Sequence, residues 1–193
     1  MPDDINKTLK KEADYYLKKM GLHSILESYG QVHIVGSYTL DLMVWKDLDI
    51  EVEVQEYDIC KHFDVGMNIT LVLDPHKMKF RNELIGKNPG LPEGLYWRVH
   101  MIDGWKFDVW ALNSKLIKKN QDFTNRLLGK LNPFNRKIIL DIKTRISKNP
   151  HYTNDVISVD IYKAVLEKGV CSFDEFAKLI FNEKGIDINS RTT

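Results

Sequence analysis

The chain has 193 residues, of which 43% are hydrophobic, and a formal net charge of +1 at pH 7. This length suits one domain with an appendage or two small lobes. No stretch approaches the about 18 apolar residues that a membrane helix needs, and the polar N-terminus is unlike a signal sequence, so we expect a cytoplasmic protein. The near-neutral total charge argues against a long nucleic acid as the main ligand, because such ligands usually bind strongly basic surfaces.

Charge is distributed unevenly along the chain. Residues 41 to 58 hold seven acidic side chains against Lys46 alone, whereas residues 113 to 150 hold ten Lys or Arg side chains against two acids. A basic block beside an acidic segment suits a triphosphate or another polyanion. The alternative interpretation is that these basic side chains form the solvated faces of amphipathic helices.

The two cysteines, Cys60 and Cys171, form no close motif. Their spacing indicates neither a zinc site nor a disulfide framework. We expect both to be buried free thiols, which is the usual state of an isolated cysteine in such a protein.

The first part of the chain predicts two helices and a strand, followed by a turn. Helices are expected over residues 3 to 20 and 22 to 29, and a strand over residues 31 to 35. Gly36 and Ser37 come directly after this strand. A glycine there lets the backbone approach an anion closely, and the serine hydroxyl and the N–H groups of a helix start favour phosphate.

An acidic strand follows this turn. Side chains in a strand alternate between its faces, so Asp47, Asp49, Glu51 and Glu53 share one side and four apolar residues share the other: Leu48, Ile50, Val52 and Val54. Asp47 and Asp49 are expected about 6 to 7 Å apart, close enough to bind one hard divalent cation or to bridge two. The alternative is a half-buried strand with a solvated acidic face. Four acids in line beside one lysine repel one another unless a cation is present, which favours the metal site.

This pattern resembles the signature of the nucleotidyltransferase superfamily typified by DNA polymerase β, which includes antibiotic and small stand-alone nucleotidyltransferases. Gly36-Ser37, nine residues and then Asp47-Leu48-Asp49 on a strand carry the resemblance, which covers roughly residues 30 to 112. The family also needs a third carboxylate on a later strand, and Asp108 lies in such a setting.

The middle of the chain predicts a helix, a short strand, a loop and a hairpin. The helix, residues 57 to 71, carries an apolar stripe of Ile59, Phe63, Met67 and Leu71. A short strand is expected over residues 78 to 84, and the Gly/Pro-rich loop of residues 86 to 94 is expected to form a lip of the site. Strands over residues 95 to 102 and 105 to 112 would be joined by the turn at Asp103-Gly104.

The register of this hairpin decides where Arg98 points. A two-residue loop would place Asp108 opposite Val99, whereas a three-residue loop of residues 102 to 104 would place it opposite Arg98. The binary pattern favours the second register, because it gathers the apolar side chains on one face. Arg98 would then face the metal site and bind phosphate or hold Asp108 ionised, with a surface salt bridge as the alternative.

From Asn113 onward the apolar period changes to about 3.6, which predicts helices over residues 113 to 130, 133 to 146, 154 to 168 and 172 to 182. The expected fold is therefore α/β (α+β): a mixed-sheet nucleotidyltransferase core with an N-terminal helix in residues 1–112, and a helical C-terminal region in residues 113–193.

The resemblance implies a Mg²⁺-dependent nucleotidyltransferase that transfers a nucleoside monophosphate from an NTP to an acceptor and releases pyrophosphate. Asp47, Asp49 and Asp108 would be the catalytic metal ligands, with two Mg²⁺ ions expected and Mn²⁺ as a substitute. Four residues would bind the nucleotide: Gly36, Ser37, Lys46 and Arg98. ATP is the first choice of donor, and a small-molecule acceptor is favoured over protein or RNA.

Two other classes of function compete with this interpretation. One is an antitoxin-like or regulatory nucleotide-binding protein of the same fold that acts on a partner protein, although the complete carboxylate trio argues against a purely structural role. The other is a polymerase that extends RNA ends, which is disfavoured because the chain lacks room for a separate RNA-binding domain. The sequence alone sets neither the acceptor nor the oligomeric state.

Overall fold

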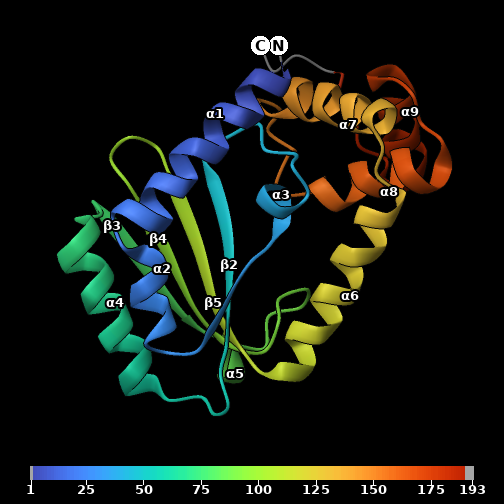
Figure 1. Ribbon diagram of the computed structural model, residues 1–193. Coiled ribbons are helices and arrows are strands. Elements are labelled where there is room, and N and C mark those ends of the chain that lie inside the picture. The colour runs from blue at the N-terminus through green and yellow to red at the C-terminus, as the bar shows by residue number, and fades with distance from the viewer. Residues whose placement is uncertain (1, 190–193) are drawn as a thin grey trace.

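A single mixed sheet organises the computed structural model, which describes residues 2–189 (Figure 1). Its strand order is β1-β2-β5-β4-β3, with β2 and β5 parallel and all other neighbours antiparallel. The strands are β1 (Gln31–Ile34), β2 (Asp47–Glu53), β3 (Lys77–Asn82), β4 (Leu95–His100) and β5 (Lys106–Leu112). The mixed sheet with flanking helices confirms the predicted fold class.

Helices cover the two faces of the sheet unequally. On one face lie α1 (Pro2–Asp14), the π-helical turn η1 (Tyr15–Lys19), α2 (Leu22–Glu27) and α4 (Ile59–Leu73), while α6 (Ser114–Lys130) lies on the other side (Figure 1). The remaining helices are α3 (Gly36–Thr39), α5 (Glu83–Gly86), α7 (Pro133–Ile146), α8 (Ser158–Lys168) and α9 (Phe173–Lys184). None of the helices in the described part of the chain is long and apolar enough to cross a membrane.

The buried side of the sheet follows the predicted alternation in β2. Leu48, Ile50 and Val52 are fully buried, and they pack with side chains of α1, α2 and α4 in one hydrophobic cluster. Asp47 and Asp49 therefore point to the opposite, less covered face, because alternate strand residues point to opposite sides. The sequence pattern thus places the acidic row correctly.

A second hydrophobic cluster lies among α7, α8 and α9. Leu40 and Leu42 belong to it although they precede β2, so the segment between α3 and β2 joins the sheet to the C-terminal helices. The division of the chain at residue 113 stays a prediction.

The hairpin between β4 and β5 has the predicted three-residue loop. The Met101 N–H donates to the Trp105 carbonyl at 2.8 Å, and Gly104 has a φ of +93°. Arg98 is directly opposite Asp108. The prediction that the two residues share a face is confirmed, and the two-residue register is excluded.

The predicted apolar stripe of α4 lies on the wrong side of the helix. Its members are 46 to 75% exposed: Ile59, Phe63, Met67 and Leu71. Val65 and Ile69 are buried instead, and Gly66 faces the indole of Trp97 so closely that a Cβ atom would lie 2.8 Å from the ring. The close helix-to-sheet approach at this glycine decides the orientation of α4, and the alternative stripe had equally regular spacing in the sequence.

Both cysteines are free, as predicted, but the expectation that they are buried is wrong. Cys60 is exposed in the first turn of α4, and Cys171 is exposed in the loop between α8 and α9. Neither position faces a hydrophobic cluster.

Candidate active site

The register of the strands arranges polar side chains in rows across the open face of the sheet. Each row below runs from β3 through β4 and β5 to β2. The first is Lys77, His100, Lys106 and Asp47; the second is Lys79, Arg98, Asp108 and Asp49; the third is Arg81, Tyr96, Trp110 and Glu51. The acids thus gather toward β2 and the cations toward β3.

The three predicted catalytic carboxylates come from the two parallel strands. Asp49 of β2 is in register with Asp108 of β5, and Asp47 lies two residues earlier on the same face of β2. Burial raises the pKa of both Asp47 and Asp49, and the negative charge of Asp108 raises both further. The site therefore holds more negative charge than its own surroundings compensate.

Asp108 is engaged by two neighbours in the sheet. Its Oδ1 accepts hydrogen bonds from Arg98 Nε at 2.8 Å and from the Tyr96 hydroxyl at 2.6 Å, and its Oδ2 accepts one from the terminal guanidinium nitrogen Nη2 at 2.7 Å. The hydrogen bond to Asp108 is the main reason why the pKa of Arg98 is raised. Arg98 thus meets the site, as predicted, through a bidentate ion pair with Asp108.

No group of three or more His, Cys, Asp or Glu side chains in residues 2–189 is arranged to hold a metal ion as it stands. Among the three aspartates, Asp108 already has both carboxylate oxygens hydrogen-bonded, by Arg98 and Tyr96.

The Gly36-Ser37 turn lies directly against the carboxylate of Asp49. Gly36 has a φ of +64°, and a Cβ atom there would lie 2.2 Å from Asp49 Oδ2. Only glycine fits this position, for backbone and for space. Ser37 lines the same cavity as Asp47 and Asp49. The structure therefore brings the predicted phosphate-binding turn and the paired aspartates together.

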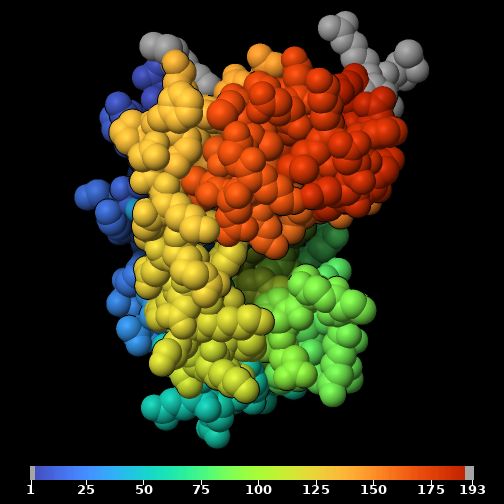
Figure 2. All heavy atoms as spheres, turned by 90° about the vertical axis from the view of Figure 1, so that its right-hand side faces the viewer, coloured from blue at the N-terminus to red at the C-terminus, as the bar shows by residue number. Residues whose placement is uncertain are grey.

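Two cavities open on these residues. One, of about 240 Å³, extends from Asp47 and Asp49 to α6 and α8, where Phe123 and Tyr162 contribute to its wall. The other, of about 580 Å³, contains Asp49 and is bordered by Gly90 to Glu93. Figure 2 shows a hollow between α6 in yellow, the orange and red C-terminal helices and the green segment around α5. Residues 90 to 93 of the predicted loop thus border a cavity that contains Asp49, and the role of the loop as a lip of the site stays a prediction.

Lys46 is not brought to these two cavities. Its Nζ lies 3.0 Å from a carboxylate oxygen of Glu12 in α1 and 4.0 Å from one of Asp103 in the hairpin loop. Its role as a nucleotide ligand stays a prediction.

Lys143 of α7 is a buried cation that the sequence interpretation missed. Its Nζ donates hydrogen bonds to the Leu42 carbonyl at 2.7 Å and to the Tyr162 hydroxyl at 3.3 Å. Burial lowers its pKa to about 7, although Asp49 and Asp47 oppose the shift. The sequence signal for its burial was its position on the apolar face of the helix, four residues after Ile139 and three before Ile146.

Glu51, the next residue of the acidic row, is more deeply buried than expected. It is only 8% exposed, its Oε1 accepts a hydrogen bond from Asn120 Nδ2 at 2.7 Å, and its Oε2 has no hydrogen-bond partner within the described residues. Burial raises its pKa. Glu51 thus ties α6 to β2 beside Asp49.

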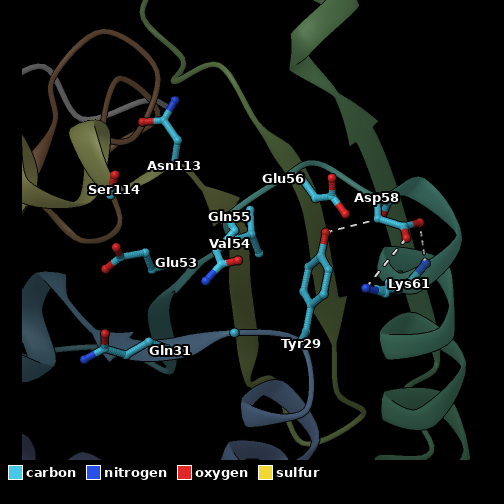
Figure 3. A pocket seen from close by; sticks show the side chains of 11 residues that line it. Tyr29, Gln31, Glu53, Val54, Gln55, Glu56, Asp58, Lys61, Asn113 and Ser114 are labelled. Carbon is cyan, nitrogen blue, oxygen red and sulfur yellow. Dashed lines mark hydrogen bonds and ion pairs between the residues drawn. The ribbon is translucent and has the colours of Figure 1, made fainter.

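A separate cavity of about 470 Å³ lies at the far end of β2, away from Asp47 (Figure 3). Its walls include Tyr29, Glu53, Glu56 and Asn113. The Tyr29 hydroxyl points to the backbone carbonyl of Asp58, at 3.3 Å. None of the predicted site residues lines this cavity.

Several solved structures have a similar fold. The Cid1 poly(U) polymerase, with Mg and 3′-dATP bound, matches with a TM-score of 0.57 at 15% identity over 83% of this chain and 49% of that chain. Terminal uridylyl transferase 4 from Trypanosoma brucei gives 0.55 at 11% identity over 87% of this chain and 60% of that chain. The GLD-2/RNP-8 complex gives 0.57 at 10% identity over 100% of this chain and 67% of that chain.

These solved chains share the fold that the sequence motif predicted. The chain has the fold of these three solved structures. It spans only about half of the Cid1 chain and 60% of the uridylyl transferase chain. No protein-family model matches the sequence, and no curated protein matches it significantly.

Proposed function

We propose that the chain is a divalent-metal-dependent nucleotidyltransferase that transfers a nucleoside monophosphate from an NTP, with ATP as first choice, to an acceptor hydroxyl. The observation that carries this proposal is the meeting of Asp49 with Asp108 across β2 and β5, with Gly36 packed against the Asp49 carboxylate. The fold shared with solved nucleotidyltransferases supports it.

The residues present fit a hard divalent cation. Carboxylate oxygens are the ligands that Mg²⁺ prefers, and the raised pKa values of Asp47 and Asp49 indicate negative charge that lacks compensation. Asp47, Asp49 and Asp108 would hold two Mg²⁺ ions, with Mn²⁺ as a substitute. When bound, the ions would neutralise charge on the triphosphate and on the leaving pyrophosphate.

The protein groups around the carboxylates have separate tasks in this proposal. The backbone at Gly36 and the Ser37 hydroxyl bind the phosphates of the donor, and the cavity toward α6 and α8 receives its nucleoside. The acceptor oxygen bonds to the α-phosphorus while the bond from this atom to the pyrophosphate oxygen breaks. Asp108 takes the hydroxyl proton, and its two hydrogen bonds from Arg98 fix the orientation of its carboxylate beforehand.

The acceptor is the least defined reactant. Two of the similar solved structures are a poly(U) polymerase and a terminal uridylyl transferase, and these names state the activity of those two proteins only. The small-molecule acceptor and the cytoplasmic location stay predictions for this chain.

Donor binding is the direct test. Calorimetric titration with Mg-ATP should give a binding isotherm for the wild type that is lost in the Asp47→Asn, Asp49→Asn double variant. Glu53→Gln is the matched control, because Glu53 lies further along β2 and outside both cavities at the carboxylates. Equal binding by wild type and double variant would contradict the assignment. Donor binding with no transfer of labelled nucleotide to components of a cell extract would favour the regulatory alternative.

A further inference from the structure

A basic platform adjoins the catalytic carboxylates on the side away from the proposed donor. It consists of Lys77, Lys79 and Arg81 of β3, Arg98 of β4 and Lys106 of β5, which the strand register places on one face of the sheet. The three β3 side chains are exposed. Helices α1, α2 and α4 lie against the other face, so this surface is the floor of the open side of the sheet (Figure 1).

Part of the positive charge of the basic platform is uncompensated, namely that of Lys77 and Lys79, whereas Lys106 lies opposite Asp47 in the sheet and its charge acts on that carboxyl. Within residues 2–189, no carboxylate lies within 4.0 Å of the amino group of Lys77, Lys79 or Lys106. Arg81 has one carboxylate neighbour, that of Glu83 at 3.7 Å, and Arg98 pairs with Asp108. A surface of this kind raises the local concentration of anions.

The pKa of His100, which lies in the middle of the basic platform, responds to the positive charge around it. Its pKa is lowered, first by burial and then by the positive charges of Arg98, Lys77, Lys106 and Lys79. Its Nε2 atom is buried and has no hydrogen-bond partner in the described part of the chain.

A cavity connects the basic platform to the reaction site. It has a volume of about 190 Å³ and runs from Asp108 to Lys79 and Arg81, with the ring of Trp110 in its wall. Trp110 and Leu91 also line the 580 Å³ cavity that contains Asp49. Lys79 lies two strands from Asp108 in the same row, which is about 10 Å from backbone to backbone.

We propose that the basic platform binds phosphate groups of the acceptor. This inference rests on the proposed function, since Asp108 receives the acceptor hydroxyl there. An acceptor whose hydroxyl meets Asp108 places a phosphate about 10 Å away over Lys79 and Arg81. The substrate class is thus an alcohol that carries phosphate at a distance from its reacting hydroxyl, with a ring between the two that can stack on Trp110.

Lysines on an edge strand also have a protective use, because charge on an edge discourages pairing with another sheet. That use does not require the charges to line a cavity. Lys79 and Arg81 line the cavity that ends at Asp108. Their placement beside the reacting groups is what points to a ligand.

The test compares two double variants that each remove two positive charges. Lys79→Gln with Arg81→Gln alters the basic platform where it lines the cavity, whereas Lys7→Gln with Lys11→Gln alters two exposed lysines of α1. The phosphate sources are a fluorescent single-stranded oligonucleotide of about ten nucleotides, within the range that single-strand sites cover, and ribose 5-phosphate. Mg-ATP binding is measured in parallel for all three proteins.

For a single-stranded oligonucleotide, the slope of log affinity against log salt should fall by about 1.4 in the platform variant, since each lost phosphate contact removes about 0.7. The α1 variant should keep the wild-type slope, and all three proteins should bind Mg-ATP alike. Platform-dependent binding of ribose 5-phosphate alone would support the inference and identify a small acceptor. The inference is overturned if the wild type binds neither probe, or if both variants bind them equally well. Failure of the wild type to bind Mg-ATP would instead overturn the proposed function.

Discussion

Replacement of Asp49 by asparagine should stabilise the metal-free protein, and the gain should grow with pH. Burial and the charges of Asp47 and Asp108 raise the pKa of Asp49 in the folded state above its ordinary value. The folded protein therefore keeps a proton that the unfolded chain loses near pH 4. As the pH rises from there, the wild type loses about 1.4 kcal/mol of stability per pH unit until the raised pKa is passed. The asparagine side chain of the variant has no proton to lose.

The expected gain for Asp49→Asn is close to zero at pH 4 and about 3 kcal/mol at pH 6. For a chain of this size that corresponds to an increase in Tm of about 6 to 12 °C. Thermal melts at pH 4, 5 and 6 in the presence of EDTA measure it. Asp64→Asn is the control, because Asp64 is exposed on α4, which covers the face of the sheet opposite to the three aspartates of the site.

Addition of Mn²⁺ at pH 6 should reduce the difference in Tm between Asp49→Asn and the wild type, because the ion stabilises only the wild type, which keeps all its metal ligands. A gain that is the same at pH 4 and pH 6, or a loss at both, would refute the view that uncompensated negative charge accumulates at this site.

Three further changes test other parts of the site. Asp108→Asn should lower turnover by orders of magnitude and leave the Tm within a few degrees; a large loss of Tm with normal activity per folded molecule would make its role structural. Gly36→Ala should weaken Mn²⁺ binding, because its Cβ would displace the Asp49 carboxylate. Gly21→Ala, with positive φ but open space, is its control, and equal metal binding by the two variants would contradict the steric argument. Burial lowers the pKa of Lys143 to about 7, so this lysine should make the folded protein more stable as the pH rises from 7 to 9. Lys143→Met should abolish that contribution. Urea unfolding of the variant and the wild type at both pH values measures it.

The sheet side of the site could be predicted because its pattern is local. Alternation along β2 determines which side chains accompany Asp47 and Asp49, and the strongly patterned hairpin determines the register of Asp108 and Arg98. Both follow from the period of two in a strand, which a few neighbouring residues suffice to show.

The parts that sequence reasoning missed depend on contacts between distant segments. Lys79 joins the row of Asp108 only because β3 pairs with β4 at the edge of the sheet, and the short predicted strand had no assigned partner. The exposed side of α4 is set by the contact of Gly66 with Trp97. Lys143 is buried because α7 packs against the segment around Leu42, whose carbonyl accepts its hydrogen bond. Local periodicity contains none of this information.

The parallel pairing of β2 with β5 has a consequence for the order of folding. The hairpin of β4 and β5 closes over a three-residue loop, whereas β2 can join β5 only after the intervening α4, β3 and β4 are in place or looped out. Non-local strand pairing is slow because the entropy of loop closure is lost before the contacts form. Asp49 and Asp108 therefore become neighbours late, and the appearance of Mn²⁺ affinity during refolding should lag behind the formation of helices.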